Sequence, residues 1–264
     1  MRAALSEKQV GPLMRQWRAR RRLSQQELAL DAGISARHLS FVETGRSKPG
    51  REMLLRVLDE LDVPPREQNQ ILLAAGHAPV FPETPLSGPD LAPVREALDL
   101  ILARHEPYPA FVIDRAWNLV SANPAALALL SDVDIDPALI EPPVNVLRVS
   151  LHPRALGSVV VDLAAWRDHF LERLERQLAL TGDDEVAALA EEIAGYPIPA
   201  AELRRGPLGA VSFRLPRGKL SFFGMFATFD TPFDVTSSEL AVEQLFPADE
   251  ATAAVLHERA GEGR

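Results

Sequence analysis

The sequence of 264 residues contains no cysteine. This excludes disulfide bonds, thiolate nucleophiles and cysteine-ligated zinc sites, and it is typical of a reducing compartment. No uncharged apolar run approaches the roughly 20 residues that a membrane-spanning helix needs. No basic segment followed by an apolar run opens the chain, so a secretory leader is not expected either. We therefore expect a cytoplasmic protein that has no membrane partner.

Catalytic motifs are also missing from the sequence. Its six histidines are scattered, without an H-E-x-x-H or comparable ligand pair. There is neither a G-x-S-x-G nucleophile elbow nor a G-x-x-x-x-G-K phosphate loop. The acidic run from Asp183 to Glu185 precedes an apolar-periodic segment, where it suits the positive end of a helix better than a metal site. We therefore expect no enzyme activity, no metal site and no cofactor.

Charge is distributed unevenly along this acidic chain, whose formal net charge is -9. Residues 1–51 carry eleven Lys or Arg against four Asp or Glu, which leaves a net of +7 there and -16 on the remainder. Such asymmetry indicates a polyanion-binding region attached to an acidic body. A solvated basic face would give the same count, so charge alone leaves both interpretations open.

Prolines mark a boundary inside the chain. The stretch HAPVFPETPLSGPDLAP contains five prolines, a composition typical of an extended, semi-rigid connector. We predict a helical domain over residues 1–76, a proline-rich linker over 77–93 and a second domain over 94–264. The hydrophobic content of 47% is enough to give both domains a buried core.

Signals at helix ends predict five helices in the N-terminal region. Ser24 with Glu27 forms a capping box at the start of the second helix, and Ser35 is a suitable N-cap for the third. Pro65 is a favourable first-turn residue for the fifth helix, which should stop at Gly76. Apolar residues at helical spacing mark the buried faces of the first and fourth helices: Val10, Leu13, Met14, Trp17, Met53, Leu54, Val57, Leu58 and Leu61.

The stretch LSQQELALDAGISARHLSFVETGRSKPG has the spacing of a helix-turn-helix. Gly33 can adopt the positive φ that a tight turn needs, and the small Ala29 lets two helices cross closely. A generic helical hairpin would share the apolar pattern, but it would less often combine capped helices, this glycine and flanking cations. In this motif the second helix enters the major groove of DNA. Apolar side chains fill the wedge between the helices: Leu28, Ile34, Leu39 and Val42.

The same stretch resembles the lambda-repressor-like, XRE-type helix-turn-helix domain over roughly residues 10–65, since caps, turn and the closing V-E-x-G match at the right spacing. The resemblance implies binding to double-stranded DNA. It places Ser24 and Gln25 on phosphates, and it places Ala36, Arg37 and Phe41 near base edges. The full predicted set of DNA-contacting residues is Ser24, Gln25, Gln26, Ala36, Arg37, His38, Ser40, Phe41, Arg46, Lys48 and Arg51.

Structural roles also follow from this resemblance. Arg18 and Glu43 match a pair that forms a semi-buried salt bridge in such domains, and we expect them, like Gly33, to support the fold. Ala36 and Phe41 replace the glutamines of many relatives, and apolar side chains at these positions can contact a thymine methyl group. Because one such module is small, useful specificity normally requires two copies on neighbouring half-sites, so we expect a homodimer.

The second region begins with AFVIDRAWNLVSANPAALALL, in which two short strands flank a polar turn and Asn123 caps a helix. This order resembles the opening of a PAS-type sensor domain. A long amphipathic helix follows in VDLAAWRDHFLERLERQLAL. The segments AVSFRLP and KLSFFGMFATFDTPF then read as a closing hairpin that turns at Arg217 and Gly218. We predict an α+β, PAS-like domain with its helices on one face of the sheet.

Most of residues 90–255 resembles the MmyB-like ligand-binding domain, which often follows an XRE-type head. The resemblance implies a pocket for a small, lipid-like ligand. Arg148, Arg167 and His169 are candidates to anchor a carboxylate. Aromatic strand residues are candidates for the apolar wall, although plain core packing gives the same pattern, and alternation lets only one set face the helices: Phe222, Phe223, Met225, Phe226 and Phe229.

We therefore expect a sequence-specific, dimeric transcription regulator whose C-terminal domain senses a small apolar ligand, for example a fatty-acid-like one. The alternative is a DNA-binding interaction protein, such as an antitoxin, whose C-terminal domain binds a protein partner and senses no ligand. Co-purification of a small molecule or of a protein would distinguish them.

Overall fold

The computed structural model describes residues 10–198, 210–229 and 234–262 of the chain. Two of the N-terminal cations counted above, Arg2 and Lys8, lie outside these ranges. The chain folds as two compact units, one formed mainly by Met1–Glu83 and the other by most of residues 84–264. Among the described residues, no helix combines the length and apolar character that crossing a membrane would require.

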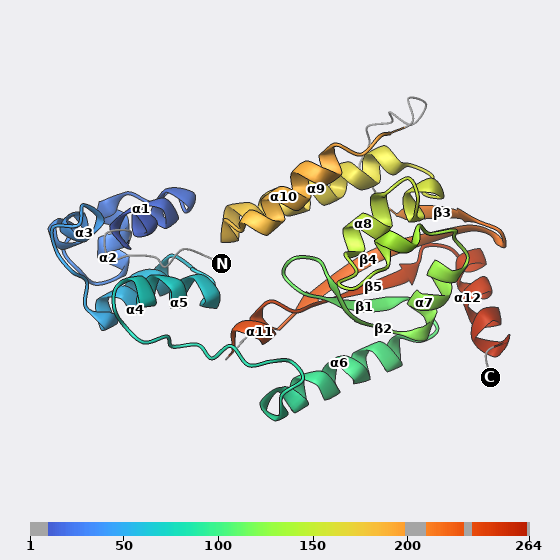
Figure 1. Cartoon of the computed structure of the whole chain (residues 1–264), viewed down its shortest axis with the longest axis horizontal. Helices are drawn as coiled ribbons and strands as arrows, with labels where there is room; N and C mark the ends of the chain where they lie inside the picture. The colour runs from blue at the N-terminus through green and yellow to red at the C-terminus, as the bar shows by residue number, and fades with distance from the viewer. Residues whose placement is uncertain (1–9, 199–209, 230–233, 263–264) are drawn as a thin grey trace. The chain divides into compact units, whose positions relative to one another are not determined.

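Five helices form the N-terminal unit, which confirms the predicted helical fold (Figure 1). Their apolar stripes meet in one core whose most buried members include Met14, Leu28, Leu39, Leu54 and Leu58. The helices are α1 (Val10–Arg20), α2 (Gln25–Asp31), α3 (Ala36–Glu43), α4 (Arg51–Glu60) and α5 (Pro65–Ala74).

Local signals set the ends of α2 and α3. The Ser24 hydroxyl accepts a hydrogen bond from the Glu27 N–H, and the Glu27 carboxylate accepts one from the Ser24 N–H at 2.7 Å, which makes a complete capping box. The Ser35 side chain caps α3 by accepting from the N–H of His38. Gly33 has a φ of +64° in the turn between the helices, a conformation that costs a glycine little.

The segment between the two units is attached at both ends. The side chain of Asn69 in α5 hydrogen-bonds to the backbone of Val80 and Phe81. Farther on, the guanidinium of Arg95 donates to the backbone carbonyls of Leu86 and Gly88. The proline-rich stretch is therefore held by side chains of the helix that precedes it and of the helix that follows it.

The second unit is an α+β fold around an antiparallel sheet of five strands in the order β2-β1-β5-β4-β3. This confirms the predicted fold class. The strands are β1 (Ala110–Ile113), β2 (Leu119–Ala122), β3 (Val211–Leu215), β4 (Gly218–Thr228) and β5 (Ala241–Pro247). The helices are η2 (Pro89–Leu91), α6 (Ala92–His105), α7 (Pro124–Ser131), η3 (Pro137–Leu139), α8 (Val146–Leu151), η4 (Leu156–Ser158), α9 (Leu163–Thr181), α10 (Asp184–Ala194), α11 (Val235–Ser238) and α12 (Glu250–Glu262).

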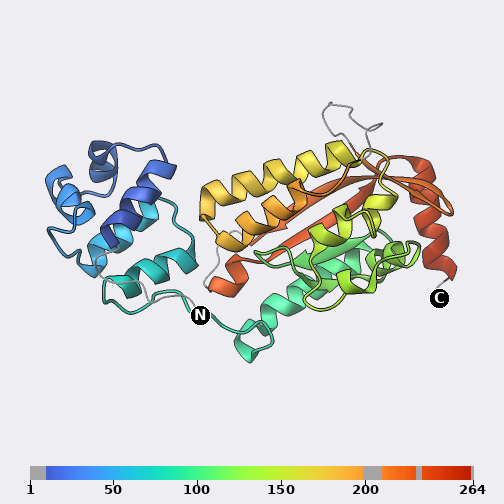
Figure 2. The ribbon, with the colours of Figure 1, turned by 45° about the horizontal axis from the view of Figure 1, so that its top comes forward.

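Two expectations about this sheet were wrong. The β3–β4 hairpin does not close the domain, because β5 follows it and pairs with both β4 and β1 at the centre of the sheet. Helices also cover both faces. Leu98 and Leu102 of α6 pack on Ala110, Val112 and Val242, whereas α9 and α10 run side by side along the opposite face (Figures 1 and 2).

Strand register assigns each side chain to a face of the sheet, because successive side chains point to opposite faces. Glu243 at the centre of β5 pairs with Phe111 of β1 and with Phe226 of β4. These three side chains therefore share one face, which we call the cavity face. On β3 the cavity face carries Phe213, which packs against Phe222.

Candidate functional site

Helix α3 presents one side to solvent and buries the other. Leu39, Val42 and Glu43 are buried against α1 and α2. Of the residues of α3 predicted to contact DNA, Arg37 is exposed, His38, Ser40 and Phe41 are partly buried, and Ala36 is partly buried at the edge of the core. The structure thus gathers the residues predicted to contact bases on one side of one short helix.

Arg37 and Phe41 are neighbours on this outer side. They lie four positions apart, and the Arg37 guanidinium carbon is 5.3 Å from the centroid of the Phe41 ring. At this separation a guanidinium is attracted to the face of an aromatic ring. This contact favours conformations in which the Arg37 guanidinium lies over the Phe41 ring.

The remaining predicted DNA contacts flank α3. Ser24 and Gln26 are exposed at the start of α2. Arg46 and Lys48 are exposed in the loop that follows α3, and Arg51 is the first residue of α4. Polar side chains before α3 and exposed cations after it are suited to phosphate contacts beside a groove.

Glu43 ties three helices together beneath this surface. Its carboxylate accepts hydrogen bonds from Arg18 Nε at 2.7 Å and Arg18 Nη2 at 2.9 Å, and it accepts another from Gln25 Nε2 at 2.7 Å. Burial alone would raise the pKa of Glu43, but these hydrogen bonds and the charges of Arg18 and Arg15 hold it below its usual value. Gln25, predicted to contact phosphate, thus also links α2 to α3.

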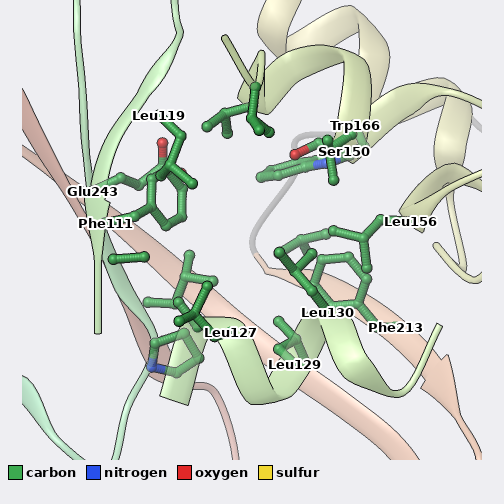
Figure 3. A pocket seen from close by; sticks show the side chains of 18 of the residues that line it. Phe111, Leu119, Leu127, Leu129, Leu130, Ser150, Leu156, Trp166, Phe213 and Glu243 are labelled. Atoms are coloured by element: carbon green, nitrogen blue, oxygen red, sulfur yellow. The ribbon is translucent and has the colours of Figure 1, made fainter. Parts of the chain in front are cut away.

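The second unit contains a cavity of about 80 Å³ between the cavity face and helices α7, α8 and α9 (Figure 3). Its walls are apolar with few exceptions, and they include Phe111, Leu129 and Phe213. Leu127 of α7 lines the cavity and is 52% exposed, so this side chain also contacts solvent. An apolar cavity with few polar groups is the common form of a small-molecule site.

Three polar side chains contribute to the walls: Ser150 of α8, Trp166 of α9 and Glu243 of β5 (Figure 3). Glu243 is only 5% exposed, and burial raises the pKa of its carboxyl to about 7 although the charge of Arg173 opposes the shift. No described residue hydrogen-bonds to Glu243 Oε2 or to the indole nitrogen of Trp166, and both atoms are buried.

Two family models match this chain and together show its family. Residues 94–258 match the family model described as the MmyB-like transcription regulator ligand binding domain, and residues 14–68 match the helix-turn-helix model. The chain belongs to the MmyB-like transcription regulators. It is therefore a DNA-binding regulator with a domain of the ligand-binding type, and its families are not families of enzymes.

Other comparisons add little to this family assignment. A solved structure similar to this chain is the crystal structure of the clp gene regulator ClgR from Corynebacterium glutamicum. The aligned residues are 24% identical in sequence and make up 38% of this chain and 94% of the ClgR chain, and the TM-score is 0.24. No curated protein matches significantly.

In this MmyB-like regulator, none of the eight residues predicted to bind ligand lines the cavity. Five of them line a neighbouring hollow of about 130 Å³: His169, Phe222, Phe223, Met225 and Phe226. This hollow shares Trp166, Val211 and Glu243 with the cavity. The cavity and the hollow therefore adjoin, and the three shared residues form part of both walls.

The other three predicted ligand residues lie elsewhere. Arg148 pairs with Glu192 at 2.8 Å on the surface, and Arg167 donates to the backbone carbonyl of Tyr196. Phe229 packs with the cluster around α6. The sequence-based candidates thus spread over three regions.

Sequence reasoning missed Glu243 and Trp166 as cavity residues. Trp166 lies within the predicted amphipathic helix, and nothing in the sequence of that helix indicates that it faces a cavity. Glu243 is the single charged residue of the run LAVEQLF, at a position that alternation groups with Ala241 and Leu245. A single carboxylate on the apolar side of a strand is a signal that could have identified it.

Proposed function

We propose that this regulator binds a palindromic operator as a homodimer and that a small apolar ligand bound in the second unit modulates this binding. The cavity behind α7 and α8 is the observation that carries the proposal. We further propose that residues 1–76 form the DNA-binding domain, 77–93 the linker and 94–264 a PAS-like sensing and dimerisation domain, and that the protein acts in the cytoplasm.

In the proposed complex, α3 lies in the major groove. Arg37 would donate two hydrogen bonds to the O6 and N7 atoms of a guanine, the commonest specific contact of arginine, and Phe41 would contact a neighbouring thymine methyl. Arg46, Lys48 and Arg51 would contact phosphates and set the orientation of the module. The exposure of these cations and the guanidinium–ring contact of Arg37 support this assignment.

The size of the cavity constrains how a ligand enters. Its volume of about 80 Å³ is smaller than the roughly 150 Å³ of an engineered cavity that holds benzene. A ligand with a fatty-acid-like chain would therefore have to displace α7 or α8 from the sheet. Such a ligand would stabilise an open arrangement of these helices, and it can change operator affinity only by binding one arrangement better than the other.

The DNA-binding part of the proposal is tested by footprinting with genomic fragments at modest salt, combined with sedimentation of the protein–DNA complex. We expect protected half-sites whose centres lie about one helical turn apart, bound by two copies of the chain. Complete absence of protected fragments, or a monomer on a palindromic operator, would contradict it.

The sensing part is tested by native mass spectrometry of the full-length protein as purified. A bound small molecule that alters operator affinity at fixed salt is the expected result. A stoichiometric protein partner without a small molecule would instead favour the antitoxin-like alternative.

A further inference from the structure

Glu243 lies in a buried position, where ionisation of a carboxyl group is energetically unfavourable. It lies at the centre of the central strand, between Phe111 and Phe226 on the cavity face. No described residue hydrogen-bonds to its buried Oε2. Buried polar atoms in native proteins nearly always have a partner, so an unpartnered one requires a specific explanation.

Arg173, whose charge acts on Glu243, does not provide that partner. Arg173 of α9 forms no ion pair with Glu243, and its guanidinium instead lies 3.5 Å from the ring centroid of Phe226 and 4.9 Å from that of Trp117. The charge of Arg173 still favours the ionised carboxylate of Glu243. The carboxyl therefore keeps an unused acceptor within a largely apolar wall.

Trp166 contributes the complementary group. Its indole nitrogen is buried without a hydrogen-bond partner among the described residues, and its side chain lines the same cavity as Glu243 (Figure 3). The walls of a single cavity thus contain one unpaired hydrogen-bond acceptor and one unpaired donor. An indole can only donate, and an ionised carboxylate can only accept.

The geometry points to a ligand that is an apolar amphiphile with a neutral polar end, an alcohol or a primary amide, which donates to Glu243 and accepts from Trp166. This inference rests on the proposed sensing function and specifies the ligand class. A free carboxylate fits poorly, because it has no proton to donate and would be repelled by an ionised Glu243. An alkane fits poorly as well, because it would leave both protein groups unpaired.

The test compares decanol, decanamide and decanoate, which share one chain length and differ in the polar end. Each is titrated at pH 8 into the full-length protein, and displacement of an environment-sensitive apolar dye is measured. We expect decanol and decanamide to bind about tenfold or more tightly than decanoate, as a site built for a donor rejects an analogue without one.

Two variants assign the selectivity to the named groups. Glu243→Gln removes the charge, so decanoate should bind more tightly and the preference for decanol should fall to about threefold or less. Trp166→Phe removes the donor and should weaken decanol and decanamide alike. Glu172→Gln is the matched control, since this carboxylate is exposed on α9, pairs with Arg176 and does not line the cavity, so the change should leave all three affinities unchanged.

The outcomes separate this inference from the proposed function. Binding of none of the three molecules would overturn both. Binding of decanoate as tightly as decanol would overturn the inference and leave apolar sensing intact. Should Glu243→Gln fail to fold, the wild-type order of affinities and the response of Trp166→Phe still decide the outcome.

Discussion

Two buried glutamates distinguish the two units of this regulator. Glu43 in the N-terminal unit is 2% exposed, and Glu243 in the second unit is 5% exposed. Glu43 accepts hydrogen bonds from Arg18 and Gln25, which keep its pKa low. Glu243 has no such donors among the described residues, and burial raises its pKa to about 7.

The difference separates a structural carboxylate from one available to a ligand. Glu43 connects three helices, so its ionised state is part of the packing that positions α3. Glu243 lies on a strand held by backbone hydrogen bonds on both sides, so the sheet forms without its carboxyl. The Glu243 carboxyl is not needed for the pairing of the strands and lies in a cavity wall, where a bound ligand can donate a hydrogen bond to it.

Of the four substitutions, Glu43→Ala should have the largest effect, and that effect is on the stability of the N-terminal unit. We expect the N-terminal unit to lose about 3 kcal/mol or more of unfolding free energy, because Arg18 is left largely buried without its partner. Urea denaturation measures this loss. The control Glu172→Ala breaks an exposed ion pair with Arg176, whose side chains are 71% and 64% exposed, and it should cost about 1 kcal/mol or less. Equal effects of both changes would show that Glu43 has no special structural role.

Glu243→Gln tests whether the buried carboxyl of the second unit makes its stability depend on pH. The pKa of Glu243 is raised by burial from 4.5 to about 7, so the folded state holds the proton of this carboxyl more tightly than the unfolded state does; this contribution to stability is complete below pH 4.5 and is lost as pH rises through 7. The wild-type second unit should lose about 3 kcal/mol between pH 4.5 and pH 8 from this group, and the variant should lack this component. Identical pH profiles from chemical denaturation would show that Glu243 ionises freely in the folded protein.

Arg37→Ala tests the role in DNA recognition of helix α3, which Glu43 holds in place. If Arg37 contacts a guanine, the variant should lose about 1–3 kcal/mol of operator affinity and much less affinity for random DNA. Competition binding at fixed salt measures both. Arg176→Ala, on an exposed part of α9, is the control and should change neither. Equal losses on all sequences would make Arg37 a backbone contact.

Lys48→Ala should give the smallest effect. If Lys48 binds a phosphate, the variant should have a lower affinity for operator and random DNA alike, and the salt dependence should become shallower by about one unit. Binding measured over a series of salt concentrations gives this slope. An unchanged slope would place Lys48 outside the DNA interface.

Sequence and structure agree best in the N-terminal unit. Its capping box, its turn glycine and the stripes of its helices all use residues that lie close in sequence, so they could be recognised by spacing. The second unit depends on pairing over long distances. Strand β5 is separated from its partner β1 by more than 120 residues, and the polar pair Glu243 and Gln244 obscures its apolar pattern.

The sequence by itself determined the helix-turn-helix and the α+β class, because local propensity and short-range spacing carry that information, and its resemblance to known domains indicated the regulator family. Only the tertiary structure decided which side chains share a cavity. Glu243 and Trp166 come from a strand and a helix far apart in the chain, and they line the same space because β5 inserts at the centre of the sheet beneath α9. Arg148 and Arg167, which the sequence favoured, have their own protein partners instead.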